Sequence, residues 1–475
     1  MCRLVDVARR GQSAENRGCC GNSIAPTAWT RAAGEQDTRM ISLTEKPGLI
    51  SRRAALGAIA AAAGSVLLSP QSASAARAWK GSRQDRAFLD DLERQGCLFF
   101  WEQASQKTGQ VLDRAHYNLG GERDPRRMAS IAATGFGLTA LCIADKRGYL
   151  PHAQIVERVR TTLNWHLNQL PEEHGFFYHF TDIETGARWR RSELSSIDTA
   201  LLLCGVLTAR AHFRDERIDR AARQIYERVD WPWMLNGGDT FSMGWHPETG
   251  FLKARWSHYC ELMMIYLLAI GSPTHPVTPS YWNNFERPTV HYGDLTFISG
   301  AATLFTHQYS QAWFDFRHKR DAYTDYFENS VLATRAHKAF CLSYPDWYNS
   351  DYWGISASDY AHGYTAWGGP PAHGPIDGTV VPCAAAGSLP FLPADCVAVL
   401  RAMREKWGQH AWGRYGFVDA FHPAAGWYDP DVLGIDQGIS VMMAENLRSG
   451  FVWETFMRNA ECSRAMLLVG FKNNA

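Results

Sequence analysis

The chain has 475 residues, with 48 basic and 48 acidic side chains and 46% hydrophobic residues. This composition excludes an intrinsically disordered chain, and a formal net charge of zero offers no broad basic surface for nucleic acid. Aromatic residues make up 12% of the chain, and the flat, half-polar faces of Trp and Tyr suit a ligand site as well as a core.

Residues 51–75 have the pattern of an export signal. Arg52 and Arg53 precede an apolar run over 54–68, and Ala73-Ser74-Ala75 offers small residues for cleavage. This pattern predicts a signal peptide of the twin-arginine type, and therefore a periplasmic or secreted protein. The apolar run is shorter than a membrane-spanning helix requires, so we expect no stable membrane anchor. An uncleaved anchor is the alternative.

The signal divides the chain into three parts. Met40 is a suitable true start, which makes 1–39 a spurious or unstructured extension and 40–75 the signal peptide. Residues 76–475 are then one catalytic domain, with 39 basic and 43 acidic side chains. We expect this domain to be a monomer.

Segments with helical periodicity recur in pairs from residue 85 onward. The first member of each pair is apolar on all sides, as in a buried helix, and the second is amphipathic. The predicted buried members are 128–145, 194–211, 257–270, 299–313, 379–389 and 436–447. The predicted amphipathic members are 151–170, 215–230, 278–287, 323–343, 393–407 and 451–459. Six such pairs predict an all-α fold, the (α/α)6 toroid.

Three aromatic segments with turn residues precede buried helices. They are 175–190, 241–256 and 415–430, with Glu-Thr-Gly or Ala-Ala-Gly at the expected turn. Each is predicted to be a β-hairpin. We expect these hairpins to line a cleft, because long connections on one face of a fold concentrate function there.

Four carboxylates that follow these hairpins are candidate catalytic groups. Glu193 and Asp198 follow the first hairpin, Glu261 the second and Asp436 the third. Glu261 enters an apolar helix, where desolvation raises a carboxyl pKa toward the value that a general acid needs. Each has a structural alternative: Glu261 as the partner of Ser257 in a capping box, and the others as helix-start residues.

Residues around these carboxylates are candidates for holding a saccharide. Trp and Tyr pack against the apolar C–H faces of sugars, while carboxylate, amide and guanidinium groups bind hydroxyls. For each Trp the alternative is core packing, and for Asp182 it is a solvated turn. The candidates are Asp182, Trp189, Arg191, Trp245, Tyr259, Trp427 and Gln437.

The sequence has no motif for a metal or a cofactor. It lacks HExxH, a P-loop and GxSxG, and its cysteines form no CxxC pair. We therefore expect buried thiols, with Cys383 and Cys396 as the one pair worth checking for a disulfide. Glu445, farther into the last buried helix, is expected to pair with an arginine.

Four blocks of the sequence resemble the bacterial glycoamylase-like domain, which includes glycoside hydrolase family 144. They are GFFYHFTDIETGAR, SELSSIDTALLLCG, YCELMMIYLLAIGSPTHP and YGFVDAFHPAAGWYDPDVLGIDQGISVMMAENLRSGFVWETFMRN. The resemblance covers residues 85–470. It implies an (α/α)6 toroid that hydrolyses β-1,2-glucan, in an endo mode or in an exo mode that releases sophorose.

The same resemblance implies roles for the candidate residues. Glu261 matches a catalytic acid, Glu193 and Asp198 match an acidic cluster, and Asp436 lies in a matching IDQG block. It also favours inversion at the anomeric carbon. The alternatives are a non-catalytic glucan-binding protein, and a lyase or transglycosylase that uses His307, Tyr309 or His258-Tyr259.

Overall fold

The computed structural model describes residues 79–370 and 374–474. The expected signal peptide (40–75) and the extension 1–39 lie outside these residues and stay predictions. In the part of the chain that is described, no helix has both the length and the apolar character needed to cross a membrane.

Six helices of the described residues are buried along most of their length and form the inner ring of a toroid. Apolar and small side chains cover every face of these helices, so exposing any face to water would cost free energy. They are α3 (Ile131–Arg147), α5 (Ser196–His212), α8 (Met263–Gly271), α9 (Tyr309–Trp313), α11 (Pro382–Ala386) and α13 (Gly434–Ser449). Each of the six predicted buried segments thus contains one of these helices, but α8, α9 and α11 are shorter than predicted, and a short 3₁₀ turn, η2 (Leu304–His307), precedes α9.

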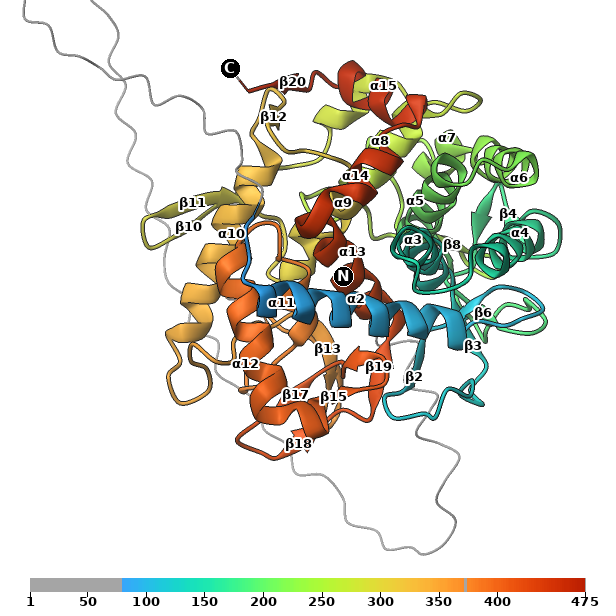
Figure 1. Cartoon of the computed structure of the whole chain (residues 1–475). Coiled ribbons are helices and arrows are strands. Elements are labelled where there is room, and N and C mark those ends of the chain that lie inside the picture. Colours follow the sequence, from blue (N-terminus) through green and yellow to red (C-terminus); the bar gives the residue numbers. More distant parts are fainter. Residues whose placement is uncertain (1–78, 371–373, 475) are drawn as a thin grey trace, which may run out of the picture. The chain divides into compact units, whose positions relative to one another are not determined.

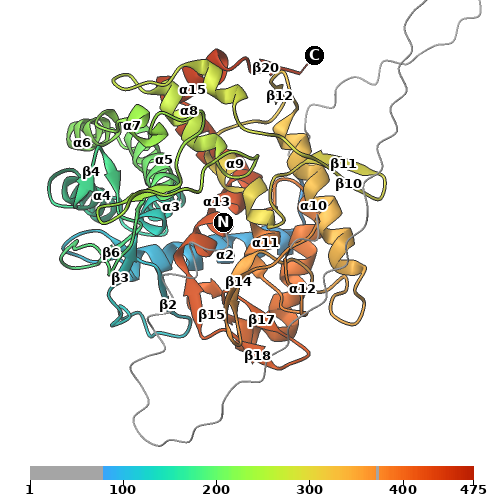
Figure 2. The same cartoon turned by 180° about the vertical axis from the view of Figure 1, so that it is seen from behind.

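Amphipathic helices cover this inner ring from outside. Four of them confirm predicted segments: α4 (His152–Asn168), α6 (Glu216–Glu227), α10 (Tyr326–Leu342) and α12 (Pro393–Ala411). Figures 1 and 2 show the ring, with α3–α6 on one side of the molecule and α10–α12 on the other.

The remaining outer elements differ from the prediction. The segment 278–287 forms only a 3₁₀ turn, η1 (Pro279–Asn283), because prolines at 279 and 288 limit a longer helix. The segment 451–459 contains α14 (Phe451–Phe456), and α15 (Ala460–Leu468) follows it. A further helix that the pairing pattern missed, α2 (Arg83–Glu102), packs on both α3 and α13, which also contact each other directly, and covers the junction of the first and last inner helices. The short α7 (Trp231–Leu235) was also not predicted.

Glycines allow α3 and α5 to approach closely. A Cβ atom on Gly205 would lie 2.0 Å from the carbonyl oxygen of Gly135, and one on Gly135 would lie 2.3 Å from the carbonyl oxygen of Leu201. Backbone atoms therefore touch where side chains normally separate two helices, which fixes the spacing of the inner ring at this point.

Short strands lead into three of the inner helices. β3 (Met128–Ser130) precedes α3, β7 (Leu194–Ser195) precedes α5, and β19 (Asp431–Leu433) precedes α13. Each pairs with a distant segment: β3 lies between β1 (Val111–Leu112) and β6 (Phe180–Asp182), β7 pairs with β8 (Gly244–His246), and β19 pairs with β2 (Arg114–His116). These pairings bring loops from other parts of the chain to the N-terminal ends of the inner helices.

Two of the three predicted hairpins are confirmed. They are β8 with β9 (Gly250–Phe251), and β17 (Phe421–His422) with β18 (Trp427–Tyr428). In the segment 175–190 the hairpin is shorter than predicted. Thr181 bridges to Arg188, and around the Glu-Thr-Gly turn Trp189 N–H donates to the Phe180 carbonyl and Asp182 N–H to the Ala187 carbonyl. The start of the segment pairs elsewhere, because β5 (Phe176–Phe177) pairs with β4 (Glu172–Glu173), while β6 also pairs with β3. The prediction is thus confirmed for residues 180–189 only.

The other strand pairs were not predicted. They are β10 (Thr289–Tyr292) with β11 (Leu295–Ile298), β12 (Lys319–Arg320) with β20 (Lys472–Asn473), β13 (Ala357–Tyr360) with β14 (Gly363–Ala366), and β15 (Trp412–Gly413) with β16 (Gly416–Phe417).

Buried thiols and a buried ion-pair network confirm two further expectations. The cysteines of the described residues are buried and unbridged, Cys383 and Cys396 included. Glu445 of α13 accepts from Lys146 Nζ at 2.9 Å and from Arg147 Nη2 at 2.6 Å.

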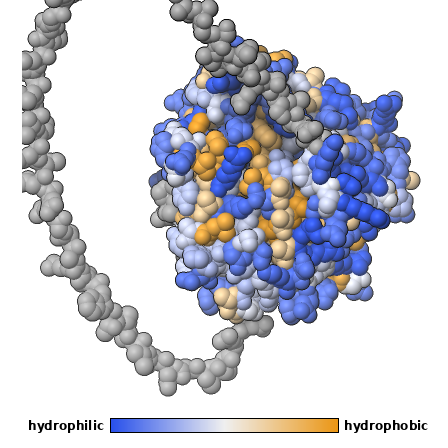
Figure 3. Space-filling view, turned by 60° about the vertical axis from the view of Figure 1, so that its left-hand side comes forward, coloured by the Kyte–Doolittle hydropathy of each residue, from blue (hydrophilic) through white to orange (hydrophobic). Residues whose placement is uncertain are grey.

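On the face shown in Figure 3, apolar side chains gather toward the centre and are surrounded by a largely hydrophilic margin.

Candidate active site

His179 lies between two of the predicted catalytic carboxylates. Its Nδ1 is 3.0 Å from Glu193 Oε1, and its Nε2 is 3.5 Å from Asp198 Oδ1. Ser195, the N-cap of α5, donates from its hydroxyl to Asp198 Oδ2 at 2.5 Å. The main chain of His179 is held as well, because its N–H donates to the Glu193 carbonyl and its carbonyl accepts from Ile131 N–H.

Burial and charge shift the pKa values of this group in different directions. Burial lowers an imidazole pKa, but the nearby Asp198 and Glu193 outweigh it and raise the pKa of His179 to about 9. Burial raises the pKa of Asp198, and His179 offsets only part of this effect. Burial also acts on Glu193, but the hydrogen bond and charge of His179 outweigh it and lower the pKa of Glu193. At neutral pH His179 is therefore a cation and Glu193 a carboxylate.

Glu261 lies in the turn before α8, two residues ahead of the first helical residue. The prediction that it enters the helix was therefore wrong in detail. Its main-chain carbonyl accepts from Ser310 Oγ at 2.6 Å, and its side chain is buried. The hydroxyl of Ser257 contacts His258 Nδ1 instead, so the capping-box alternative is not formed.

The environment of Glu261 keeps a proton on its carboxyl. Burial raises the pKa of Glu261 to about 7, and the charge of Asp198 adds to the effect. Its Oε2 has no hydrogen-bond partner among the described residues. Near neutral pH this carboxyl can therefore hold a proton on an oxygen that no protein group occupies.

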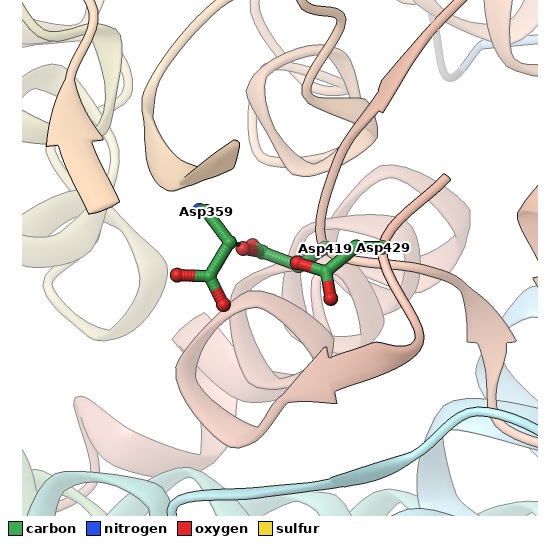
Figure 4. A group of neighbouring side chains, drawn as sticks. All are labelled: Asp359, Asp419 and Asp429. Atoms are coloured by element: carbon green, nitrogen blue, oxygen red, sulfur yellow. Dashed lines mark hydrogen bonds between the residues drawn. The ribbon is translucent and has the colours of Figure 1, made fainter. Parts of the chain in front are cut away.

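Asp436 belongs to a second acidic group. It lies in the first turn of α13, while Asp359 comes from β13, and Asp419 and Asp429 lie on either side of the β17–β18 hairpin. Figure 4 shows Asp359, Asp419 and Asp429 side by side. Asp359 N–H donates to Asp419 Oδ2 at 2.7 Å, and Arg114 Nη1 donates to Asp359 Oδ2 at 2.5 Å.

Asp419 and Asp436 share a proton. Burial raises the pKa of both carboxyls, and for Asp419 the hydrogen bond to Asp436 and the charge of Asp429 raise it well above its ordinary value. The same hydrogen bond opposes the rise at Asp436. The two carboxyls are therefore joined by a hydrogen bond that needs a proton on one of them, and the pKa of Asp419 is the more strongly raised.

The two groups act on each other electrostatically. Asp113 raises the pKa of His179, Asp198 and Asp436, and it is paired with its neighbour Arg114 at 3.1 Å. Since Asp198 also raises the pKa of Glu261, the four predicted catalytic carboxylates belong to one electrostatic environment at the N-terminal ends of α5, α8 and α13.

Sequence reasoning missed His179, Asp113, Arg114, Asp359 and Asp419. A signal for Asp419 was available, because it is a carboxylate inside the apolar segment Gly416–Phe421. His179 also lies next to the predicted acidic block. The others come from loops whose pairing partners are far away in the sequence.

The predicted substrate-binding residues fall into two groups. Asp182, Trp189, Arg191, Trp245 and Trp427 keep exposed or half-buried side chains, with Asp182 paired to Arg127 at 2.7 Å. Tyr259 and Gln437 are buried. Tyr259 stacks on Tyr326, and Gln437 donates to the Phe417 carbonyl at 2.7 Å, so their placement argues against direct contact with a substrate.

Asp359, Asp419 and Asp429 are the one group among the described residues whose ligand atoms, within 4.8 Å of one another, match the spacing of a metal site. Arg114 already neutralises Asp359, and the proton on Asp419 removes a further negative charge. The charges of this group are thus compensated by the protein's own groups. The expectation of no metal and no cofactor stays a prediction.

Comparison with known proteins finds a matching family model and a curated relative. Residues 253–460 match the Glycoamylase family model, described as “Putative glucoamylase”. An exo β-1,2-glucooligosaccharide sophorohydrolase (non-reducing end) of Parabacteroides distasonis is 26% identical over 424 residues, which cover 80% of this chain and 57% of that relative. The chain thus spans little more than half the length of this curated relative.

Solved structures give the same result for the fold. The endo-β-1,2-glucanase from Chitinophaga pinensis, in complex with sophorotriose and glucose, has a TM-score of 0.75 and 25% identity over 82% of this chain and 99% of that one. The β-1,2-glucanase from Parabacteroides distasonis has a TM-score of 0.74 and 24% identity over 82% of this chain and 60% of that one. The expected toroid and family resemblance are therefore confirmed: part of the chain matches the Glycoamylase family model, and the chain is similar to bacterial β-1,2-glucanases.

Proposed function

We propose that this protein is an exported glycoside hydrolase that cleaves β-1,2-glucan, with Glu261 as the general acid. The observation that carries the proposal is the state of Glu261: buried, with a pKa of about 7 and with Oε2 free of protein partners. A carboxyl of this kind is protonated near neutral pH and can pass its proton to a leaving glycosidic oxygen. The β-1,2-glucan-cleaving relatives supply the substrate class.

The base is one of three carboxylates. His179 lowers the pKa of Glu193, and the hydrogen bond from Asp419 opposes the rise that burial causes in the pKa of Asp436. The charge of Asp198 acts on Glu261. We propose inversion, in which this carboxylate activates a water molecule on the face opposite the leaving group. The variants Glu193→Gln, Asp198→Asn and Asp436→Asn separate the three, since only loss of the base removes turnover while oligosaccharide binding persists.

Export by the twin-arginine route belongs to the same proposal, and it rests on Arg52, Arg53 and the apolar run that follows. A fusion of residues 1–75 to a folded reporter should reach the periplasm. Replacement of both arginines by lysine should retain the reporter in the cytoplasm. Export of the lysine variant at the normal level would contradict this part of the proposal.

The primary test is product analysis of residues 76–475 with linear β-1,2-glucan, beside laminarin, starch and a polyuronate. We expect sophoro-oligosaccharides from β-1,2-glucan alone. A mixture of chain lengths would indicate endo action, and sophorose alone would indicate exo action. Cleavage of a different polymer would overturn the proposed substrate. Retention on a β-1,2-glucan gel without cleavage would favour the binding protein.

A lyase or a transglycosylase gives different products. A lyase would release unsaturated products that absorb ultraviolet light, and a transglycosylase would give longer or cyclic products. Of the groups considered for a lyase, His307 and Tyr309 are buried, and burial lowers the pKa of His307 to about 3, which disfavours a charged imidazole there.

A further inference from the structure

We propose that His179 is a positioning residue whose imidazolium holds Glu193 and Asp198 in place and favours the ionised form of both while Glu261 carries its proton. The ion-pair arrangement stands on geometry alone. Its consequence for catalysis rests on the proposed hydrolase function.

The geometry favours a doubly protonated ring. Both ring nitrogens of His179 face carboxylate oxygens, at 3.0 Å for Glu193 and 3.5 Å for Asp198. A neutral imidazole carries only one N–H, so it would turn a lone pair toward one of the carboxylates. The imidazolium satisfies both contacts.

The ring is also fixed in its place. It stacks on Phe180 with ring centroids 3.7 Å apart and an angle of 20° between the planes. Its main chain is bonded on both sides, to Glu193 and to Ile131. The side chain of His179 is 24% exposed and those of Glu193 and Asp198 are 14% and 11% exposed, so solvent screens these charges only in part.

The other charged groups around the ring favour the same state. Asp113 adds a third carboxylate that raises the pKa of His179. The cationic groups nearby are fewer: His246 lies near Glu193 and is 3.2 Å from the guanidinium of Arg188. Carboxylates thus outnumber the cations that face His179, and its pKa of about 9 leaves it charged at neutral pH.

Loss of this cation changes the protonation of the site. Asp198 is already pushed toward its neutral form by burial, and His179 is the charge that opposes this shift. Without it, Asp198 takes up a proton at higher pH, and Glu193 loses the hydrogen bond that lowers its pKa. The pKa values of Asp198 and Glu193 then move closer to that of Glu261, so the difference between the catalytic acid and the catalytic base becomes smaller.

The charge state is tested first, and without a substrate. The full chain is labelled with ¹³C at histidine Cε1 and titrated by NMR, and His179→Gln identifies the resonance. We expect a midpoint of about 9. In Asp198→Asn and Glu193→Gln the midpoint should fall by about one unit or more. If His179→Gln does not fold, these two shifts identify the signal. A midpoint near 6.5 that neither variant changes would overturn the proposal.

The catalytic consequence is tested by pH profiles of kcat/KM on β-1,2-glucan. In His179→Gln we expect a loss of about tenfold to a hundredfold and an acidic limb moved to higher pH by about one unit. His179→Lys, which keeps a cation, should return the limb toward its original position. The control is His152→Gln, since His152 pairs with Asp145 at 2.7 Å but its side chain is 69% exposed.

The outcomes separate the two proposals. A His179→Gln profile that matches the wild type would overturn the positioning role, as would a loss that is equal at all pH values and unaffected by lysine. If the wild type leaves β-1,2-glucan intact while the NMR midpoint is high, the proposed function is wrong and the ion-pair arrangement stands.

Discussion

Replacing Glu261 by glutamine should remove activity and stabilise the fold at the same time. The buried carboxyl has a pKa of about 7 in the folded chain against an ordinary value of 4.5. Because folding raises this pKa, the contribution of Glu261 to stability is greatest at low pH and is lost as the pH rises from about 4.5 to 7. At 1.36 kcal/mol per pKa unit, the wild type loses about 3 kcal/mol over this range, and Glu261→Gln does not.

The same substitution should raise the activation free energy of turnover by a comparable amount. A general acid contributes about 10²- to 10⁴-fold to turnover, so kcat should fall by that factor. The wild-type profile should also decline above pH 7 as Glu261 loses its proton, and the residual activity of the variant should not follow that limb. Both results come from one protein pair: kcat against pH on β-1,2-glucan, and melting temperature at pH 5 and pH 8.

Two outcomes would refute this reasoning. The first is unchanged turnover in Glu261→Gln, which would remove the residue from the mechanism. The second is a difference in melting temperature between variant and wild type that is the same at pH 5 and pH 8, which would show that Glu261 ionises as readily in the folded chain as in the unfolded one.

Three other predictions concern stability and stereochemistry. Glu445→Gln should have the opposite pH dependence, because burial of Glu445 is outweighed by Ser449, Lys146 and Arg147, which lower its pKa; a loss of about 3–5 kcal/mol at pH 8 that shrinks toward pH 3 would show as a lower melting temperature. Gly205→Ala should destabilise the chain by about 1–3 kcal/mol in thermal unfolding, since its Cβ would lie 2.0 Å from a backbone oxygen, while Gly120→Ala, with open space around it, should be neutral. Inversion predicts that the first sugar released from β-1,2-glucan is the α-anomer, as seen by ¹H NMR during early turnover, and an initial β-anomer would contradict it.

The sequence predicted the inner ring well because the signal is local. A helix such as α5 is apolar on every side, so no other arrangement than burial is available to it. The same reasoning failed for α2, whose position over α3 and α13 depends on contacts with the far end of the chain. It was only partly right for the hairpin at 175–190, because β5 pairs with β4 and β6 pairs with β3 as well as within its own segment.

The site was predictable only in part, for the same reason. Asp198 and Asp436 follow from their positions at the starts of buried helices. Asp359 and Arg114 do not, since their contact joins residues 245 positions apart. Which carboxyl keeps its proton was also beyond local pattern, because that depends on neighbours supplied by other loops.

Environment, and not residue type, separates acid from base in this site. Glu261 lies in buried surroundings with Asp198 as a nearby negative charge, and it keeps its proton to about pH 7. Glu193 contacts the cation of His179, which lowers its pKa, and the hydrogen bond between Asp436 and Asp419 opposes the rise that burial causes in the pKa of Asp436. Carboxyls whose pKa values are pushed apart in this way are the arrangement that acid–base cleavage of a glycosidic bond requires. The enzyme should therefore be active between the pKa of its carboxylate base and the pKa of Glu261. A substitution that removes the group that lowers the pKa of the base should raise the lower limit of this pH range.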